Sequence, residues 1–450
     1  MVWGDLDDRA ALVACLKGCD LVLHMAAFVS PAADYHPATA MQVNFGGTRN
    51  LVETVRELGQ ADATALVYIG TVAEMGDRMP PIHWGRVGDP IKPSMFDYYA
   101  VSKVAAERYV IESGLRRWVS LRQTGIIGPA MARVRDAIQF HNCLDNVLEY
   151  VSDRDSGTMM AHLASYDAAG SLPGAFWCHV YNVGGGEPCR VSTCQMYQAI
   201  YGEMGFGSLD FVVNPKHYAI RNFHGQYYLD SNSLEGYLHF RSDSMRYFYD
   251  AYLARLGAGK GLSRALCGLP GGQRLMGALI KDSFGRLLGS DHGTRHFINH
   301  NMEDHIDAFW GSRAAWETLP HKVSEMDHFT DWGTVVHIDH GYDESKPEGE
   351  LALEDMRGAA KFRGGACLSE VMEKGDWSGR LRFRCAFGHE FEASPRLVLE
   401  GGHWCPICER TSWNYGARAK VDPFFAQVWD PLHAPDEMRE YPKVVSELDV

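Results

Sequence analysis

Tyr99 and Lys103 are the residues of this sequence whose types and spacing best suit acid-base chemistry. They lie four positions apart in Tyr99-Ala-Val-Ser-Lys103, within a predicted helix over 99–113, so both side chains share one helical face. A phenol has a reference pKa of about 10, and a neighbouring ammonium group lowers it by favouring the phenolate. Thr71 ends a predicted strand, where its hydroxyl can hydrogen-bond a substrate oxygen. Together the three residues predict a proton-transfer site, although each taken alone is an ordinary surface or capping residue.

A second group of residues has the spacing of a metal site. Cys385-x3-His389 is followed, after fifteen residues, by Cys405-x2-Cys408. Three thiolates and one imidazole suit a tetrahedral Zn²⁺ with a closed, structural ligand set. The pattern resembles treble-clef-like zinc modules of the form C-x-x-G-H-x-F … W-C-P-x-C. We expect removal of the zinc to unfold the chain from about residue 360 onward and to leave the α/β section folded. Cys367 could be a further ligand, but a buried structural thiol is the preferred interpretation.

Strands and helices alternate in the part of the chain that must position Thr71, Tyr99 and Lys103. Apolar, β-branched runs predict buried parallel strands at 20–25, 65–69 and 118–122, with helices at 38–58 and 99–113 between them. This order predicts an α/β fold with a doubly wound parallel sheet of Rossmann type. We divide the chain into an α/β domain at 1–255, a mainly helical section at 256–345, and a linker with the zinc module at 346–450.

Ordered motifs along residues 2–255 resemble the extended short-chain dehydrogenase/reductase family, which includes the NAD-dependent epimerases and dehydratases. Besides the Tyr-x3-Lys pair, the motifs are Gly4-Asp5-Leu6, His24-Met-Ala-Ala27, Asn44 in Val-Asn-Phe-Gly-Gly-Thr, Arg122 to Pro129 in the form R-x5-G-P, and Tyr181-Asn-Val-Gly-Gly-Gly186.

The resemblance implies NAD or NADP as cofactor and a role for each catalytic residue. Tyr99 would be the general acid/base, Lys103 would lower its pKa and hold the ribose hydroxyls, and Thr71 would bind the reacting oxygen. The implied cofactor contacts are Asp5, Leu6, Ala26, Ala27, Asn44, Lys103 and Arg122. The implied function is an NAD(P)-dependent oxidoreductase or epimerase/dehydratase that acts on a hydroxyl or keto carbon of a small molecule.

One family feature, the glycine-rich turn that binds the pyrophosphate, is not found in the sequence. Gly184-Gly-Gly186 is followed by Glu187-Pro188 and suits a turn at a strand end. We therefore expect a Rossmann-type sheet that lacks its first βαβ unit, which leaves NAD and NADP undistinguished. Two explanations stay open: a fragment of an active enzyme, or a cofactor-free binding or scaffold protein that interacts through its zinc module.

Composition limits the partners. The formal net charge of −14 argues against nucleic-acid binding, and eleven cysteines in 450 residues are too sparse for a disulfide scaffold. With no long apolar stretch and no signal-like N-terminus, we expect a cytoplasmic protein without a membrane span.

The sequence leaves the partners and the substrate open. A homodimer and a protein partner at the zinc module are both compatible with it. The substrate, a nucleotide sugar held by Arg221 or Arg241 or a steroid-like alcohol, is undecided.

Overall fold

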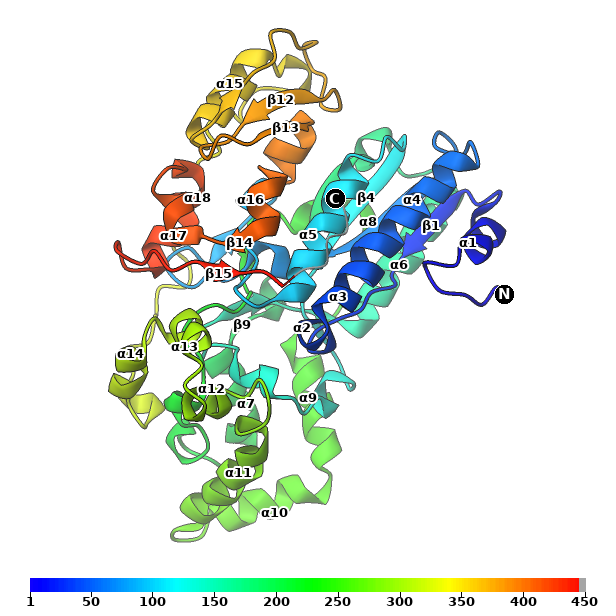
Figure 1. The fold of residues 1–450 in the computed structure, drawn as a ribbon. Helices are drawn as coiled ribbons and strands as arrows, with labels where there is room; N and C mark the ends of the chain where they lie inside the picture. Colours follow the sequence, from blue (N-terminus) through cyan, green and yellow to red (C-terminus); the bar gives the residue numbers. More distant parts are fainter. Residues whose placement is uncertain (445–450) are drawn as a thin grey trace.

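A computed structural model describes residues 1–444 of the chain, apart from the side chain of Ala132. At its centre lies a four-stranded parallel sheet in the order β1-β2-β4-β8 (Figure 1). The strands are β1 (Leu21–His24), β2 (Ala65–Thr71), β4 (Arg117–Gln123) and β8 (His179–Val183). All neighbouring strands pair in parallel. The predicted α/β class with a parallel sheet is therefore confirmed.

Alternate residues of β2 face opposite helical layers. Leu66 and Tyr68 pack in a buried cluster with residues of three helices: α1 (Arg9–Leu16), α4 (Gly47–Glu57) and α5 (Tyr98–Ile111). Ala65 and Val67 pack on the other face against α6 (Asp153–Ala168). This two-residue alternation is why the strand is apolar along its length, as both of its faces are covered.

Shorter elements complete residues 1–255. The helices are α2 (Ala32–Tyr35), α3 (Pro37–Ala40), α7 (Thr193–Glu203), α8 (Asn232–Leu238) and α9 (Met245–Leu256). The strands are β3 (Trp84–Gly85), β5 (Ile126–Ile127), β6 (Val147–Glu149), β7 (Val151–Ser152), β9 (Arg190–Ser192) and β10 (Tyr227–Tyr228).

The section 256–345, predicted to be mainly helical, contains helices up to Thr318, and residues 319–345 are mostly irregular apart from the 3₁₀ turn Val323–Glu325. The helices are α10 (Ala258–Cys267), α11 (Gly272–Leu288), α12 (Thr294–Asn299), α13 (Glu303–Trp310) and α14 (Arg313–Thr318). They form the part of the molecule farthest from the sheet in Figure 1. Among residues 1–444, no helix is both long and apolar enough to cross a membrane.

The C-terminal part combines short strands with short helices. Its elements are α15 (Leu353–Phe362), β11 (Ala366–Cys367), β12 (Leu381–Arg384), β13 (Glu390–Ala393), α16 (Pro406–Thr411), β14 (Ser412–Trp413), α17 (Tyr415–Ala419), α18 (Pro423–Trp429) and β15 (Tyr441–Pro442). Strands β11, β12 and β13 form an antiparallel sheet that precedes the Cys405-x2-Cys408 turn.

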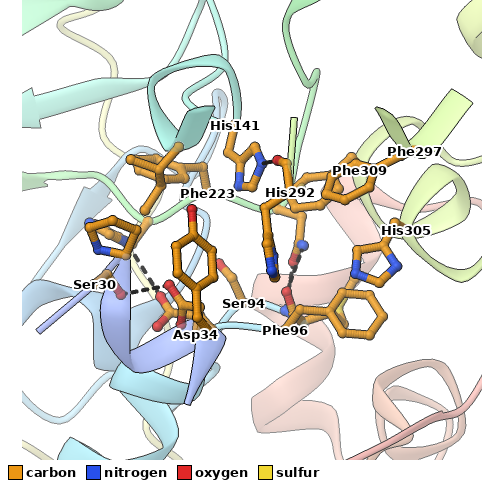
Figure 2. A pocket seen from close by; sticks show the side chains of 17 residues that line it. Ser30, Asp34, Ser94, Phe96, His141, Phe223, His292, Phe297, His305 and Phe309 are labelled. Carbon is orange, nitrogen blue, oxygen red and sulfur yellow. Dashed lines mark hydrogen bonds and ion pairs between the residues drawn. The ribbon is translucent and has the colours of Figure 1, made fainter. Parts of the chain in front are cut away.

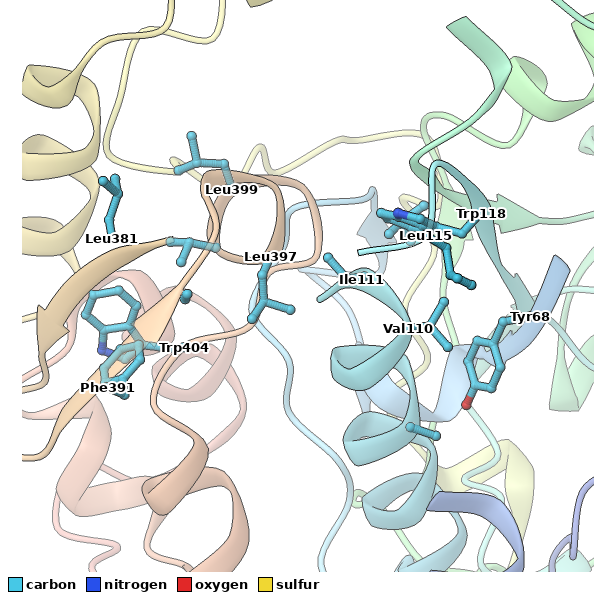
Figure 3. Packing of buried hydrophobic residues seen from close by; sticks show 14 of the residues in the cluster. Tyr68, Val110, Ile111, Leu115, Trp118, Leu381, Phe391, Leu397, Leu399 and Trp404 are labelled. Carbon is cyan, nitrogen blue, oxygen red and sulfur yellow. The ribbon is translucent and has the colours of Figure 1, made fainter. Parts of the chain in front are cut away.

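The C-terminal part has no core of its own. Leu397 and Trp404 belong to the same buried cluster as Ile111 and Trp118 of the α/β section (Figure 3). His340, where the stretch that reads as a linker begins, is also buried, and its Nε2 lies 2.9 Å from a carboxylate oxygen of Asp89. The structure thus packs the C-terminal part, as far as it is described (346–444), onto the α/β section, where composition alone indicated a module on a linker.

Candidate functional site

Thr71 and Tyr99 meet at the carboxyl end of β2. Their side chains are close enough for the Thr71 hydroxyl to influence the pKa of Tyr99. The Thr71 hydroxyl also accepts a hydrogen bond from the amide of Ala73 (3.2 Å), and the Thr71 amide donates to Glu74 Oε1 (3.2 Å). This capping box begins the short 3₁₀ helix Val72–Met75 and fixes the Thr71 hydroxyl at the edge of the sheet. The two predicted residues are therefore brought together where open α/β sheets bind ligands.

Lys103 lies one turn further along α5 and is buried. Its Nζ donates to the carbonyl of Ile69 (2.6 Å) and sits 4.1 Å from the centroid of the Tyr68 ring. Burial lowers the pKa of Lys103 to about 8, although the carboxylates of Glu74 and Glu107 favour its charged form. The group is thus still mostly an ammonium at neutral pH, and the phenol ring that it contacts is that of Tyr68.

Burial raises the pKa of Tyr99 above its ordinary value, and the Thr71 hydroxyl opposes that rise. In this state the side chain is a neutral phenol at neutral pH. It can therefore donate a proton to a substrate oxygen, the direction of transfer that a carbonyl reduction requires.

Two carboxylates hold the first turn of α5 that carries Tyr99. Asp97 is the N-cap and accepts from the amide of Ala100 (2.8 Å), and Asp34 Oδ1 accepts from the amide of Tyr98 (2.9 Å). Side-chain acceptors of this kind satisfy amides that have no partner inside the helix. The position of Tyr99 is therefore set by residues from two separate loops.

The predicted cofactor residues fall into two groups by exposure. Asp5 and Ala26 are exposed, while Leu6 and Ala27 are half-buried. Ala26 and Ala27 follow β1 and lie at the carboxyl edge of the sheet, next to the end of β2. Both have small side chains, and Ala26 is exposed at that edge.

Two further predicted cofactor residues, Asn44 and Arg122, form hydrogen bonds inside the protein with their polar groups. The Asn44 amide bonds to both backbone groups of Phe28 (2.7 and 2.9 Å) and donates to Ser102 Oγ (2.9 Å). It therefore ties the loop after β1 to α5. Arg122 has no exposed surface, and its Nη2 donates to Glu107 Oε2 and to the carbonyl of Gly401, both at 2.6 Å.

The structure brings the four predicted zinc ligands together. Cys385 Sγ lies 3.8 Å from Cys408 Sγ, and His389 Nδ1 lies 3.3 to 3.6 Å from the sulfurs of Cys385, Cys405 and Cys408. All four ligand atoms lie within 4.8 Å of one another. Cys367, in contrast, is a half-buried cysteine in β11, outside this group.

A buried network that the sequence did not predict joins the C-terminal part to α5. His403 Nε2 lies 3.0 Å from Glu107 Oε2, and Arg122 Nε lies 3.7 Å from Glu74 Oε2. All four side chains are fully buried. Glu107 and His403 are 296 positions apart, so no local spacing connects them. The sequence offered one signal of this network: charged residues occur within strands and helices that are otherwise apolar.

Comparison with known proteins finds similarity to a family for the first part of the α/β section. Residues 1–155 match the model of the 3-beta hydroxysteroid dehydrogenase/isomerase family. The mouse protein "3 beta-hydroxysteroid dehydrogenase type 7" is 27% identical over 145 residues, which are 30% of this chain and 38% of that protein. The D-erythronate dehydrogenase of Cupriavidus necator is 32% identical over 123 residues, 27% of this chain and 36% of that protein.

A solved structure also resembles part of the chain. The structure of RMD from Pseudomonas aeruginosa complexed with NADPH is similar to it at 19% identity and a TM-score of 0.41. The matched region covers 56% of this chain and 86% of the RMD chain. The chain spans 38% or less of the two curated relatives described above. The similarity to the 3-beta hydroxysteroid dehydrogenase/isomerase family therefore concerns residues 1–155, the part that contains Thr71, Tyr99 and Lys103.

Proposed function

We propose that this chain is an NAD(P)-dependent oxidoreductase or epimerase/dehydratase that acts on a hydroxyl or keto carbon of a small molecule. The observation that carries the proposal is the approach of the Tyr99 and Thr71 side chains at the end of β2, with the Lys103 ammonium one helical turn from Tyr99. The similarity of residues 1–155 to a family of hydroxysteroid dehydrogenases supports the same chemistry. A nucleotide sugar and a steroid-like alcohol are the two substrate classes proposed.

Each of the three residues has a definite task in this proposal. The Thr71 hydroxyl orients the reacting oxygen, and Tyr99 gives that oxygen a proton during reduction or removes one during oxidation. The Lys103 ammonium stabilises the phenolate that forms on Tyr99 when its proton leaves. The nicotinamide cofactor, when bound, would supply or accept the hydride.

The residues at the carboxyl edge of the sheet fit the nicotinamide end of such a cofactor. Ala26 and Ala27 have small side chains at that edge, and Lys103 is the buried cation beside it. Asp5 and Leu6 stay our proposed contacts for the adenine end. For Asn44 and Arg122 we propose a supporting role instead, because Asn44 holds the loop that contains Ala27 and Arg122 is saturated by interior partners.

We also propose that Cys385, His389, Cys405 and Cys408 hold one structural Zn²⁺. A tetrahedral zinc with Zn–S of about 2.3 Å and Zn–N of about 2.0 Å places two sulfurs about 3.8 Å apart, and a sulfur and a nitrogen about 3.5 Å apart. The distances in this cluster, 3.8 Å between sulfurs and 3.3 to 3.6 Å from nitrogen to sulfur, fit that geometry. With four protein ligands the metal has no open position for chemistry, so its role would be to hold the fold.

The test of the proposed reaction is the Tyr99→Phe variant, assayed with NAD and NADP against a panel of hydroxysteroids and nucleotide sugars. General acid-base groups typically contribute 10²–10⁴-fold, so we expect turnover to fall by about that factor while circular dichroism stays unchanged. Tyr109→Phe is the matched control, because it removes a hydroxyl from the same helix whose partner is Glu53.

Near-normal turnover in Tyr99→Phe would remove Tyr99 from the mechanism. Turnover absent with both cofactors and all substrates, together with no cofactor binding in calorimetry, would instead support the cofactor-free scaffold.

A further inference from the structure

A pocket opens beside the first turn of α5, between the α/β section and helices α12 and α13 (Figure 2). Its walls come from five segments, within residues 30–35, 94–97, 138–141, 222–224 and 292–309. The hollow measures about 590 Å³ when the solvent at its open mouth is included, and about 60 Å³ of it is accessible to the centre of a water molecule.

The ionisable groups that face this pocket leave it acidic. Asp34 and Asp97 line it, and none of the described lining residues is Lys or Arg. Burial lowers the pKa of His141 and of His305 to about 4 and also lowers that of His292, so these three rings are neutral at pH 7.

Both carboxylates already cap α5, yet they remain close enough to repel each other. Burial, followed by the charge of Asp97, raises the pKa of Asp34 to about 7. At neutral pH Asp34 is therefore about half ionised, and Asp97 together with this partial charge still exceeds the partial charge of about +0.5 at one helix terminus. The ring of His224, whose Nδ1 lies 3.6 Å from Asp97 Oδ2, is the one potential counter-charge among the described residues that line the pocket. The pocket therefore has unbalanced negative charge.

Aromatic rings enclose the same space. The Tyr35 ring lies 4.1 Å from the His292 ring, and Phe96 stacks on His305 with centroids 4.1 Å apart. The faces of Tyr and Phe rings attract cations. Ser94 adds a polar contact: it is 4% exposed, lines the pocket, and its hydroxyl has no hydrogen-bond partner in the protein. A buried hydroxyl without a partner costs free energy unless a ligand or water satisfies it.

We propose that this pocket binds an organic cation, a protonated amine carried on an aromatic or alicyclic frame. The ammonium group would supply the counter-charge for Asp34 and Asp97 and donate a hydrogen bond to Ser94 Oγ. The apolar frame would pack among the surrounding rings, Phe96 and Phe223 included. A ligand with a pyrophosphate is disfavoured here, because its charges would face two carboxylates.

The binding proposal is independent of the redox function proposed above, since it requires neither a nicotinamide cofactor nor Tyr99. The cation would nevertheless lie beside the first turn of α5, because Asp34 Oδ1 also accepts a hydrogen bond from the amide of Tyr99 (3.4 Å). If both proposals hold, an amino alcohol or amino ketone is the substrate class that would satisfy them together.

The first experiment compares three probes of similar size in calorimetry with the full chain: 2-phenylethylammonium, 2-phenylethanol and phenylacetate. A charge-assisted hydrogen bond contributes about 1.5–3 kcal/mol, which corresponds to about ten-fold or more in affinity. We therefore expect the ammonium probe to bind at least ten-fold tighter than the alcohol, and phenylacetate to bind weakest. Equal affinity for ammonium and alcohol, tighter binding of phenylacetate, or no binding of the ammonium probe at millimolar concentration would overturn the proposal.

The second experiment locates the site with charge-removing variants. Asp34→Asn and Asp97→Asn each keep an acceptor oxygen for the cap of α5, so they remove charge with little change in shape. We expect each to weaken the ammonium probe by about ten-fold without changing affinity for the alcohol. Asp136→Asn is the control, because Asp136 lies 3.4 Å from the Tyr35 hydroxyl but does not line the pocket.

If the ammonium probe binds equally well to wild type and to both pocket variants, it binds elsewhere and the proposal is wrong. If a pocket variant fails to fold, the comparison of the three probes on the wild-type chain still tests the proposal. Neither result bears on the Tyr99→Phe turnover test, so failure of one proposal leaves the other standing.

Discussion

Two buried clusters of metal-binding side-chain types lie in this molecule, and their surroundings differ. One gathers Cys385, His389, Cys405 and Cys408, whose ligand atoms contact one another; the other gathers Glu74, Glu107 and His403. In the second cluster Arg122 already supplies a positive charge, since its Nη2 contacts Glu107 Oε2 at 2.6 Å. Residue types and proximity are therefore insufficient to indicate a metal site, because a built-in cation can satisfy the same carboxylates.

The two clusters also differ in how their members are brought together. The cysteine cluster forms from two short turns, and the Cys408 amide donates to Cys405 Sγ (3.5 Å) within one of them. The carboxylate cluster forms only when α5, β4 and the segment around Gly401 pack together. A local cluster can be found from spacing, whereas a cluster made by packing requires the structure.

Removal of zinc is expected to have the largest effect on stability. Structural zinc contributes about 10–16 kcal/mol in zinc-finger peptides. Because Leu397 and Trp404 pack with Ile111 and Trp118, we expect the loss to reach the α/β section as well as the residues beyond 360 (Figure 3). Elemental analysis should find one zinc per chain, and a chelator should lower the unfolding temperature of the whole protein.

Variants separate the predicted ligands from other cysteines. Cys408→Ser should lose the metal and lower the unfolding temperature as the chelator does. Cys367→Ser should keep both, since Cys367 is a thiol of the same region outside the ligand cluster. A Cys408→Ser protein that retains its zinc and its stability would refute the assigned ligands.

Glu107→Gln tests the carboxylate cluster and is expected to have the next largest effect. It removes the nearer of the two carboxylates that pair with the fully buried Arg122 and leaves only Glu74 at 3.7 Å; breaking a buried ion pair typically costs about 3–5 kcal/mol, which we take as the upper end here. The expected measurement is a lower midpoint of denaturant unfolding. Glu53→Gln, which alters the half-buried partner of Tyr109, should cost less than about 1 kcal/mol.

The pH dependence of the protein's stability provides a second test of the role of Glu107. Burial alone would raise its pKa, but Arg122 and the hydrogen bonds from His403 and Arg122 hold that pKa well below the ordinary value. The stabilisation is therefore present above the unfolded pKa of about 4.3 and is lost as the pH falls through the lower folded pKa. The difference between wild type and Glu107→Gln should shrink below about pH 4, and a constant difference would contradict this role.

How far the sequence predicts the structure depends on the range of the interactions. The helix with Tyr99 and Lys103, the strand that ends at Thr71 and the four zinc ligands follow from spacing of a few residues. Arg122 was predicted from a motif to contact the cofactor, but its interior partners are Glu107, nearby in the fold, and Gly401, which is 279 positions away. The shared core of the α/β and C-terminal parts was missed for the same reason: apolar periodicity shows that a face is buried, without showing what covers it.

His403→Ala addresses the link between the two clusters and is expected to have the smallest effect of this series. Glu107 accepts from His403 Nε2, and a hydrogen bond to a charged group contributes about 1.5–3 kcal/mol. This is less than the Glu107→Gln loss, because Arg122 keeps its carboxylate. His403→Gln can present a donor at nearly the same place as Nε2, so it should recover part of the stability that His403→Ala loses. If the two variants are equally unstable in denaturant unfolding, packing of the imidazole rather than its hydrogen bond joins the C-terminal part to α5.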